Sequence, residues 1–174
     1  MTRRPIDPRV SPAPLDDDRR HDALRAAFAN WASGVTVLSA RDDDGRVYAM
    51  TIAAFTPVSV DPPLVLACVH TDAPLASVLD EGVRCAISIL SEGQKRAATT
   101  FADRFALPAD LLTDDDVPSV VDAAATIVGI VSRVDDGGDH RIVVIAVESA
   151  ATAAGDLPPL VYWARNYRRL KAEG

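Results

Sequence analysis

Cysteine is scarce in this chain and long apolar runs are missing, and these shortages exclude several classes of protein. Only Cys68 and Cys85 occur among 174 residues, too few for the disulfide framework of a small secreted protein. No apolar run reaches the ~18 residues that a bilayer span requires, so we expect neither a membrane segment nor a membrane partner. The N-terminus has no apolar core typical of a secretory signal. These features together predict a cytoplasmic protein.

Basic residues are also few. The 18 Lys and Arg against 25 Asp and Glu give a formal net charge of −7 and a sequence pI of about 4.8. Such a balance argues against nucleic acid as a partner. The remaining composition, 48% apolar and 25% charged, is ordinary for a globular protein long enough to bury a full core.

Several catalytic and binding motifs are absent as well. The sequence has no Cys-x-x-Cys, and its three histidines, His21, His70 and His140, lie far apart, so we expect no metal site. It lacks the Gly-x-Ser-x-Gly motif of serine hydrolases. It also lacks the Gly-x-Gly-x-x-Gly and Walker motifs, so any nucleotide must bind without a Rossmann or P-loop domain.

The most informative segment is residues 50–69, with the sequence MTIAAFTPVSVDPPLVLACV. It reads as two apolar β-segments joined by a tight corner at Asp61-Pro62-Pro63. Pro57 predicts a bulge or a sheet edge, and the unbroken apolar run 64–69 predicts a strand buried on both faces. The small side chains of Ala53 and Ala54 would let a flat ligand approach the backbone. A plain hairpin inside an all-β core is the alternative interpretation.

The rest of the pattern predicts an antiparallel β-barrel with a few helices, because many strands occur without βαβ alternation. Residues 1–18, rich in proline and charge, are expected to form a flexible arm ahead of a single domain over 19–174. An amphipathic helix should follow Asp16–Asp18 and end at Gly34. A short helix is expected at 74–81, and a helix with a Ser91–Gln94 capping box should direct apolar side chains inward: Ala97, Ala98, Phe101 and Phe105. The acidic segment 106–120 is either a lid or a plain surface loop.

His140 is the histidine with the best setting for chemistry. It follows a Gly-Gly-Asp turn and opens a strand, so its ring could polarise, protonate or position a ligand near neutral pH. The alternative is a histidine that only packs against its own loop. His70, directly after the run 64–69, is placed to reach a ligand phosphate, whereas His21 should lie on the surface.

Four segments in register resemble the flavin reductase family of two-component monooxygenases over about residues 24–170. These are the first-strand motif 31–37, the segment 50–69, the strand 85–91, and the late Gly-Asp-His turn at 138–140 followed by the ending 167–170. The resemblance implies an FMN-binding split β-barrel, a Greek-key antiparallel barrel with peripheral helices. It also implies an NAD(P)H:flavin oxidoreductase that forms a homodimer and supplies reduced FMN or FAD to a partner monooxygenase.

The resemblance further implies the residues of the site. Hydride would pass from C4 of NADH or NADPH to N5 of the flavin, with His140 as the catalytic residue on the nicotinamide side. Backbone N–H groups of residues 51–55 and 68–70 would face the flavin. The residues implied in cofactor binding are Thr36, Met50, Thr51, Ile52, Ala53, Ala54, Phe55, Cys68, Val69, His70 and Tyr167.

The chain departs from the family pattern where a phosphate is usually held. Ala73 and Leu75 occupy the usual Ser and Thr positions, and neither side chain can donate a hydrogen bond. Ile145-Ala146 replaces a usual Gly-Glu pair. Two alternatives follow: a flavin- or partner-binding protein with little reductase activity, or a split barrel adapted to another flat ligand such as haem.

Overall fold

The computed structural model describes residues 16–103 and 108–170. The chain divides into two compact units, residues 1–31 and 32–174. Among the described residues, the first unit contains helix α1, and the strands belong to the second. The predicted arm, residues 1–18, lies largely outside the described residues.

Helix α1 spans Asp17–Phe28, and its N-cap Asp16 accepts a hydrogen bond from the Arg19 amide at 2.9 Å. The helix therefore begins where the acidic run predicted, but the predicted end at Gly34 was wrong. The reason is tertiary, because β1 (Ser33–Gly34) must already be extended to pair with a strand near the C-terminus. Three apolar side chains of the predicted helix face, Leu24, Phe28 and Trp31, are exposed.

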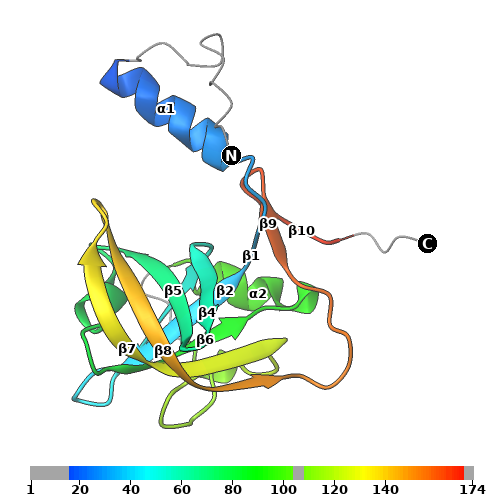
Figure 1. Cartoon of the computed structure of the whole chain (residues 1–174). Helices are drawn as coiled ribbons and strands as arrows, with labels where there is room; N and C mark the ends of the chain where they lie inside the picture. The colour runs from blue at the N-terminus through cyan, green and yellow to red at the C-terminus, as the bar shows by residue number, and fades with distance from the viewer. Residues whose placement is uncertain (1–15, 104–107, 171–174) are drawn as a thin grey trace, which may run out of the picture. The chain divides into compact units, whose positions relative to one another are not determined.

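The second unit is built on a seven-stranded sheet in which every neighbouring pair is antiparallel. Its order is β3-β2-β6-β7-β8-β5-β4, and Figure 1 shows the long β7 and β8 curling across the others. The strands are β2 (Thr36–Arg41), β3 (Val47–Ile52), β4 (Phe55–Val60), β5 (Pro63–His70), β6 (Arg84–Ile89), β7 (Ala125–Asp136) and β8 (His140–Thr152). A small sheet joins β1 to β9 (Val161–Trp163) and β10 (Asn166–Arg168). The mainly β, antiparallel fold class is confirmed.

The two edge strands of the large sheet, β3 and β4, are joined by only two residues, Ala53 and Ala54. Three Cα–Cα steps separate Ile52 from Phe55, and three trans peptides span at most about 11 Å. The sheet must therefore curl until its two edges meet at this point. We call residues 53–54 the seam of the sheet.

The hairpin β4–β5 turns at the predicted corner, 61–62, and its register shifts between Pro57 and Ser59. The expected bulge and the expected edge position at Pro57 are both confirmed. The prediction that residues 64–69 are buried on both faces was wrong. Burial alternates along β5, where Val65, Ala67 and Val69 are buried while the residues between them are half-buried, because only one face of this strand meets the core.

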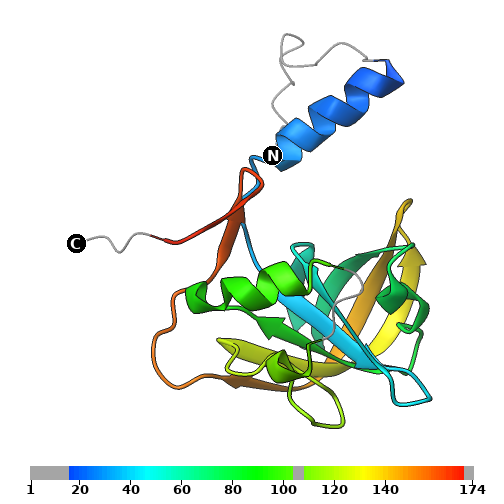
Figure 2. The same ribbon diagram turned by 180° about the vertical axis from the view of Figure 1, so that it is seen from behind.

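Helix α2 (Lys95–Thr100) covers one face of the sheet, as Figure 2 shows. The Ser91–Gln94 capping box is present, although it opens a short 3₁₀ turn, η3 (Glu92–Gln94), ahead of the helix. Ala97, Ala98 and Phe101 are buried as predicted, and pack in an apolar cluster with Val37 of β2 and others. Phe105 lies outside the described residues. The helix expected at 74–81 is only a 3₁₀ turn, η2 (Pro74–Ser77).

The acidic segment is anchored over its described part, residues 108–120. The Val120 amide donates to the buried Ser88 hydroxyl at 2.9 Å, and the Ser39 hydroxyl donates to the Pro118 carbonyl. Arg84 pairs with Asp116 at 2.7 Å. These bonds hold the segment on β2 and β6, as an anchored surface segment rather than a lid.

Gly129 lies at a register shift between β7 and β8, and we expect Gly129→Ala to lower the free energy of unfolding by about 1–3 kcal/mol. A Cβ at this position would collide with the Ala146 carbonyl oxygen and lie 2.7 Å from Cγ2 of Ile145. Urea denaturation followed by circular dichroism measures the loss. Gly93→Ala is the matched control, since its Cβ would meet only the Ser91 hydroxyl at 3.9 Å. An equal effect of both substitutions would contradict this account.

Candidate functional site

The backbone N–H groups of the seam are free to donate hydrogen bonds to a ligand. Ala53 and Ala54 are exposed, and within the described ranges neither amide N–H donates a hydrogen bond. The Ala54 carbonyl, by contrast, accepts from the Cys68 amide at 2.9 Å. This bond ties the seam to β5, two residues before its end at His70. The predicted flavin contacts around 51–55 and 68–70 therefore do lie together.

Two of the amides expected to face a ligand are occupied by the protein itself. The Thr51 amide donates to the Phe101 carbonyl at 2.9 Å, and its hydroxyl donates to the Ala98 carbonyl at 2.8 Å. The Cys68 amide is used by the Ala54 carbonyl. The prediction that these N–H groups bind a flavin edge was therefore wrong for Thr51 and Cys68. Nothing in the local sequence indicated that the Thr51 amide would be occupied, because the carbonyls of Ala98 and Phe101 come from a segment about 50 residues further along the chain.

Several predicted site residues direct their side chains into the core. Thr36, Ile52 and Val69 are buried, and the Thr36 hydroxyl donates to the Ile52 carbonyl at 3.0 Å. Met50 and Phe55 are half-buried and pack against the same apolar cluster. These five residues can offer only main-chain atoms, or a partly exposed apolar edge, to a ligand.

Tyr167 on β10 belongs to a different part of the unit. Its ring packs edge-on against Tyr162 at a centroid distance of 5.4 Å, beside the α2 cluster. Burial raises the pKa of its hydroxyl, and a hydrogen bond with Thr99 acts in the opposite direction. Tyr167 and Thr51 therefore both bond α2.

The two histidines that the sequence suggested separately are brought together. His70 ends β5 and His140 opens β8, and they are register partners with ring centroids 5.2 Å apart. Asp139, which sequence reasoning did not single out, lies with Oδ1 2.6 Å from Nδ1 of His140. The hydrogen bond and charge of His140 lower the pKa of the Asp139 carboxyl. Its position directly before the histidine was the available signal.

The usual phosphate positions offer no side-chain donor. Ala73 and Leu75 are buried in the core, and the Ala73 amide donates to the His70 carbonyl at 2.9 Å. The nearby hydroxyls of Thr71 and Ser77 donate to the carbonyls of Asp139 and Pro74 at 3.2 and 2.8 Å. The residues present thus suit a flat ring on an open backbone better than a tightly held phosphate.

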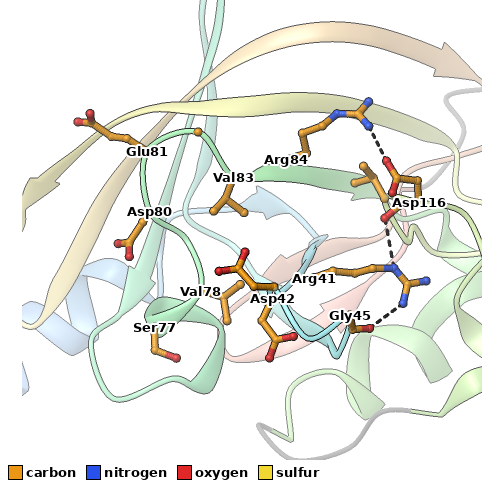
Figure 3. Close-up of a pocket in the computed structure, with 13 residues that line it drawn as sticks. Arg41, Asp42, Gly45, Ser77, Val78, Asp80, Glu81, Val83, Arg84 and Asp116 are labelled. Carbon is orange, nitrogen blue, oxygen red and sulfur yellow. Dashed lines mark hydrogen bonds and ion pairs between the residues drawn. The ribbon is translucent and has the colours of Figure 1, made fainter.

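A cavity of about 790 Å³ opens elsewhere in the second unit, and none of the predicted site residues lines it. Figure 3 shows Asp116 between its two arginines, Arg41 and Arg84. Arg41 donates to the carbonyls of Asp116 and Gly45, and Arg84 pairs with the carboxylates of Asp116 and Glu148. With both guanidinium groups engaged, the cavity presents mainly carboxylates and is a poor phosphate site.

Neither cysteine has the setting of a reactive centre. Both thiols are free, and burial raises the pKa of Cys85 to about 12, which keeps it a neutral thiol. Within residues 16–103 and 108–170, no group of three His, Cys, Asp or Glu side chains could hold a metal ion. In the same ranges no helix is both long and apolar enough to cross a bilayer.

Comparison with known proteins places this arrangement in a family. The sequence model of the protein family described as "Flavin reductase like domain" matches residues 28–171. The chain belongs to the flavin reductase-like family. The resemblance inferred from the four sequence segments is thereby confirmed.

Individual members of the family are similar over most of the chain. The reductase component of 4-hydroxyphenylacetate 3-monooxygenase from Thermus thermophilus is 39% identical over 150 residues, 86% of this chain and 96% of the relative. A probable flavin reductase from Rhizobium meliloti is 39% identical over 126 residues, but the chain spans only 40% of its length. An NADH:FAD oxidoreductase from Streptomyces globisporus, solved with NAD and FAD fragments, gives a TM-score of 0.79 at 30% identity, covering 91% of this chain and 98% of that one.

Proposed function

We propose that this protein is an NAD(P)H-dependent flavin reductase that supplies reduced FMN or FAD to a partner monooxygenase, through a single domain over residues 19–174. The observation that carries the proposal is the seam, where two exposed alanines leave their amides free beside the strand that ends at His70. Similar proteins, named as the reductase component of a monooxygenase and as an NADH:FAD oxidoreductase, support the activity. When bound, the flavin accepts a hydride from the nicotinamide.

The chain's own residues supply position and electrostatics. The free amides of Ala53 and Ala54 offer hydrogen bonds to the polar edge of a flavin ring, and their small side chains admit the ring to that distance. His140, half-exposed at the start of β8 and hydrogen-bonded to Asp139, contacts the nicotinamide and stabilises charge there. Hydride donor and acceptor are thus held without a dinucleotide-binding domain.

Steady-state oxidation of NADH and NADPH, measured with and without added FMN and FAD, tests the function. We expect turnover that depends on added flavin. A yellow protein without turnover would favour the flavin-binding alternative, and a red, haem-containing protein would favour another flat ligand. A colourless protein that is inert in every combination contradicts the proposal.

We predict that flavin binds weakly, as a substrate that is released. Ala73 and Leu75 remove two hydroxyl donors to the phosphate, each worth about 1.5–3 kcal/mol when charge-assisted, which is tenfold or more in affinity. Gel filtration of the purified protein mixed with FMN or FAD should separate the flavin. The variants Ala73→Ser and Leu75→Thr restore the hydroxyl donors and should therefore bind flavin more tightly. Because both positions are buried, the melting temperature of each variant shows whether the substitution disturbs the fold. Stoichiometric flavin that survives gel filtration would contradict the prediction.

We also propose a homodimer in the cytoplasm. The edge strand β4 carries Val58 and Val60, 52% and 93% exposed, next to the seam. An apolar edge of this kind is stabilised when a second copy covers it. The two free thiols support a reducing compartment.

Sedimentation at micromolar concentration should give twice the chain mass of 18.5 kDa. We expect Val60→Asp to shift the mass towards the monomer, because it would bury a charge in the interface. Val121→Asp, on an exposed valine of another segment, should not. A wild-type protein that is strictly monomeric excludes the dimer.

A further inference from the structure

The two histidines near the seam form a structural pair. His70 and His140 are opposite each other in the β5–β8 ladder, and their rings meet at an interplanar angle of 70° with centroids 5.2 Å apart. Their side chains are 32% and 39% exposed, so the pair lies at the surface rather than in the core. Such an edge-to-face contact gives each ring a preferred orientation.

The backbone around the pair is tied together independently of the rings. The Thr71 amide and hydroxyl both donate to the Asp139 carbonyl, at 3.0 and 3.2 Å. Each of these residues adjoins one of the histidines in the chain. The end of β5 and the start of β8 therefore keep a fixed separation.

The two rings have different hydrogen-bond partners at the same atom, Nδ1. The Asp139 carboxylate lies 2.6 Å from Nδ1 of His140 and can only accept, because His140 keeps the pKa of this carboxyl below its ordinary value. Nδ1 of His140 therefore carries a proton. Nδ1 of His70 instead accepts the Asp72 amide N–H at 3.1 Å, so the neutral His70 ring carries its proton on Nε2.

We propose that His70 is a positioning residue for His140: the neutral His70 ring, held by the Asp72 amide, orients the His140 ring, while Asp139 fixes its proton on Nδ1. Nε2 of His140 is then left as the atom that meets the ligand. It accepts a hydrogen bond in the neutral ring, as from a carboxamide N–H, and donates when the ring is protonated. The inference rests on the proposed contact between His140 and nicotinamide.

The tautomers can be measured without any substrate. Nitrogen-15 NMR of the imidazoles at about pH 8.5, roughly two units above the ordinary histidine value of about 6.5, distinguishes Nδ1–H from Nε2–H. With three histidines in the chain, single substitutions assign every signal. We expect Nδ1–H for His140 and Nε2–H for His70. The same tautomer in both rings, or the reverse assignment, overturns the proposal.

Two substitutions separate the roles of the His70 ring. His70→Asn keeps an acceptor for the Asp72 amide and loses the ring contact, whereas His70→Phe keeps a ring and loses the acceptor. We expect His70→Asn to lower kcat for NADH oxidation roughly five- to tenfold, with KM for flavin unchanged. His70→Phe should lose less activity than His70→Asn, because the ring contact is kept although the Asp72 amide no longer holds the ring.

Introducing His70→Asn in a His140→Ala background completes the test. If His70 acts through His140, His70→Asn should cause no further loss there. An undiminished loss in that background, or equal losses from His70→Asn and His70→Phe, overturns the positioning role. Melting temperatures of all variants show whether each is folded. A wild type that does not oxidise NADH would refute the proposed function, whereas the tautomer measurement decides the pairing independently.

Discussion

Replacing His140 with alanine is expected to slow flavin-dependent NADH oxidation by about ten- to a thousandfold. The ring lies at the start of β8, with Asp139 on Nδ1 and His70 against it. The loss of a polar contact made in the transition state costs on the order of 1.5–4 kcal/mol. KM for flavin should change little, because the proposed flavin contacts are the amides of Ala53 and Ala54 rather than His140.

If His140 has only a structural role, His140→Ala should affect stability rather than turnover. Melting temperature would fall, and turnover per folded molecule would be kept. Initial rates, flavin affinity and melting temperature should therefore be measured on the same preparation. His21→Ala, on an exposed position of α1, is the matched control and should match the wild type. An unchanged rate constant in a folded His140→Ala variant removes His140 from the mechanism.

Replacing Phe101 with alanine should give the largest loss of stability, about 3–5 kcal/mol. The side chain is 0% exposed and packs between α2 and the sheet, in the cluster that contains Leu90 and Leu160. Its removal leaves a cavity that rigid strands can fill only in part. The Phe101 carbonyl also accepts the Thr51 amide, so the end of β3 just before the seam should loosen with it.

Urea denaturation gives the free energy of unfolding for this variant. Phe28→Ala is the control, because Phe28 is 69% exposed, and exposed substitutions usually change stability by within about 0.5 kcal/mol. A loss below about 1 kcal/mol at Phe101 would show that the cluster does not support the sheet.

The local sequence pattern was sufficient to predict those elements that depend only on neighbouring residues. The β4–β5 corner, the edge character of Pro57 and the Ser91–Gln94 capping box each depend on residues within a few positions of one another. Such features follow from steric and hydrogen-bonding rules for short segments. The family resemblance was visible for a related reason, since its motifs are short and occur in the expected order.

The main features that sequence did not predict depend on distant partners. The break between β3 and β4 contains only alanine, with no turn residue, and it arises because the sheet closes on itself. The early end of α1 results from pairing between β1 and β9. The contact between His70 and His140 required the β5–β8 register, and register over 70 residues cannot be read from either strand alone.

The connectivity of the sheet also sets the order in which the molecule can be completed during synthesis. The β4–β5 hairpin joins the remaining strands only through β8, whose residues 140–152 leave the ribosome long after the hairpin does. Contacts between segments so far apart in the chain form slowly. The seam at Ala53 and Ala54, although made early, therefore acquires its final geometry only when nearly the whole chain is available.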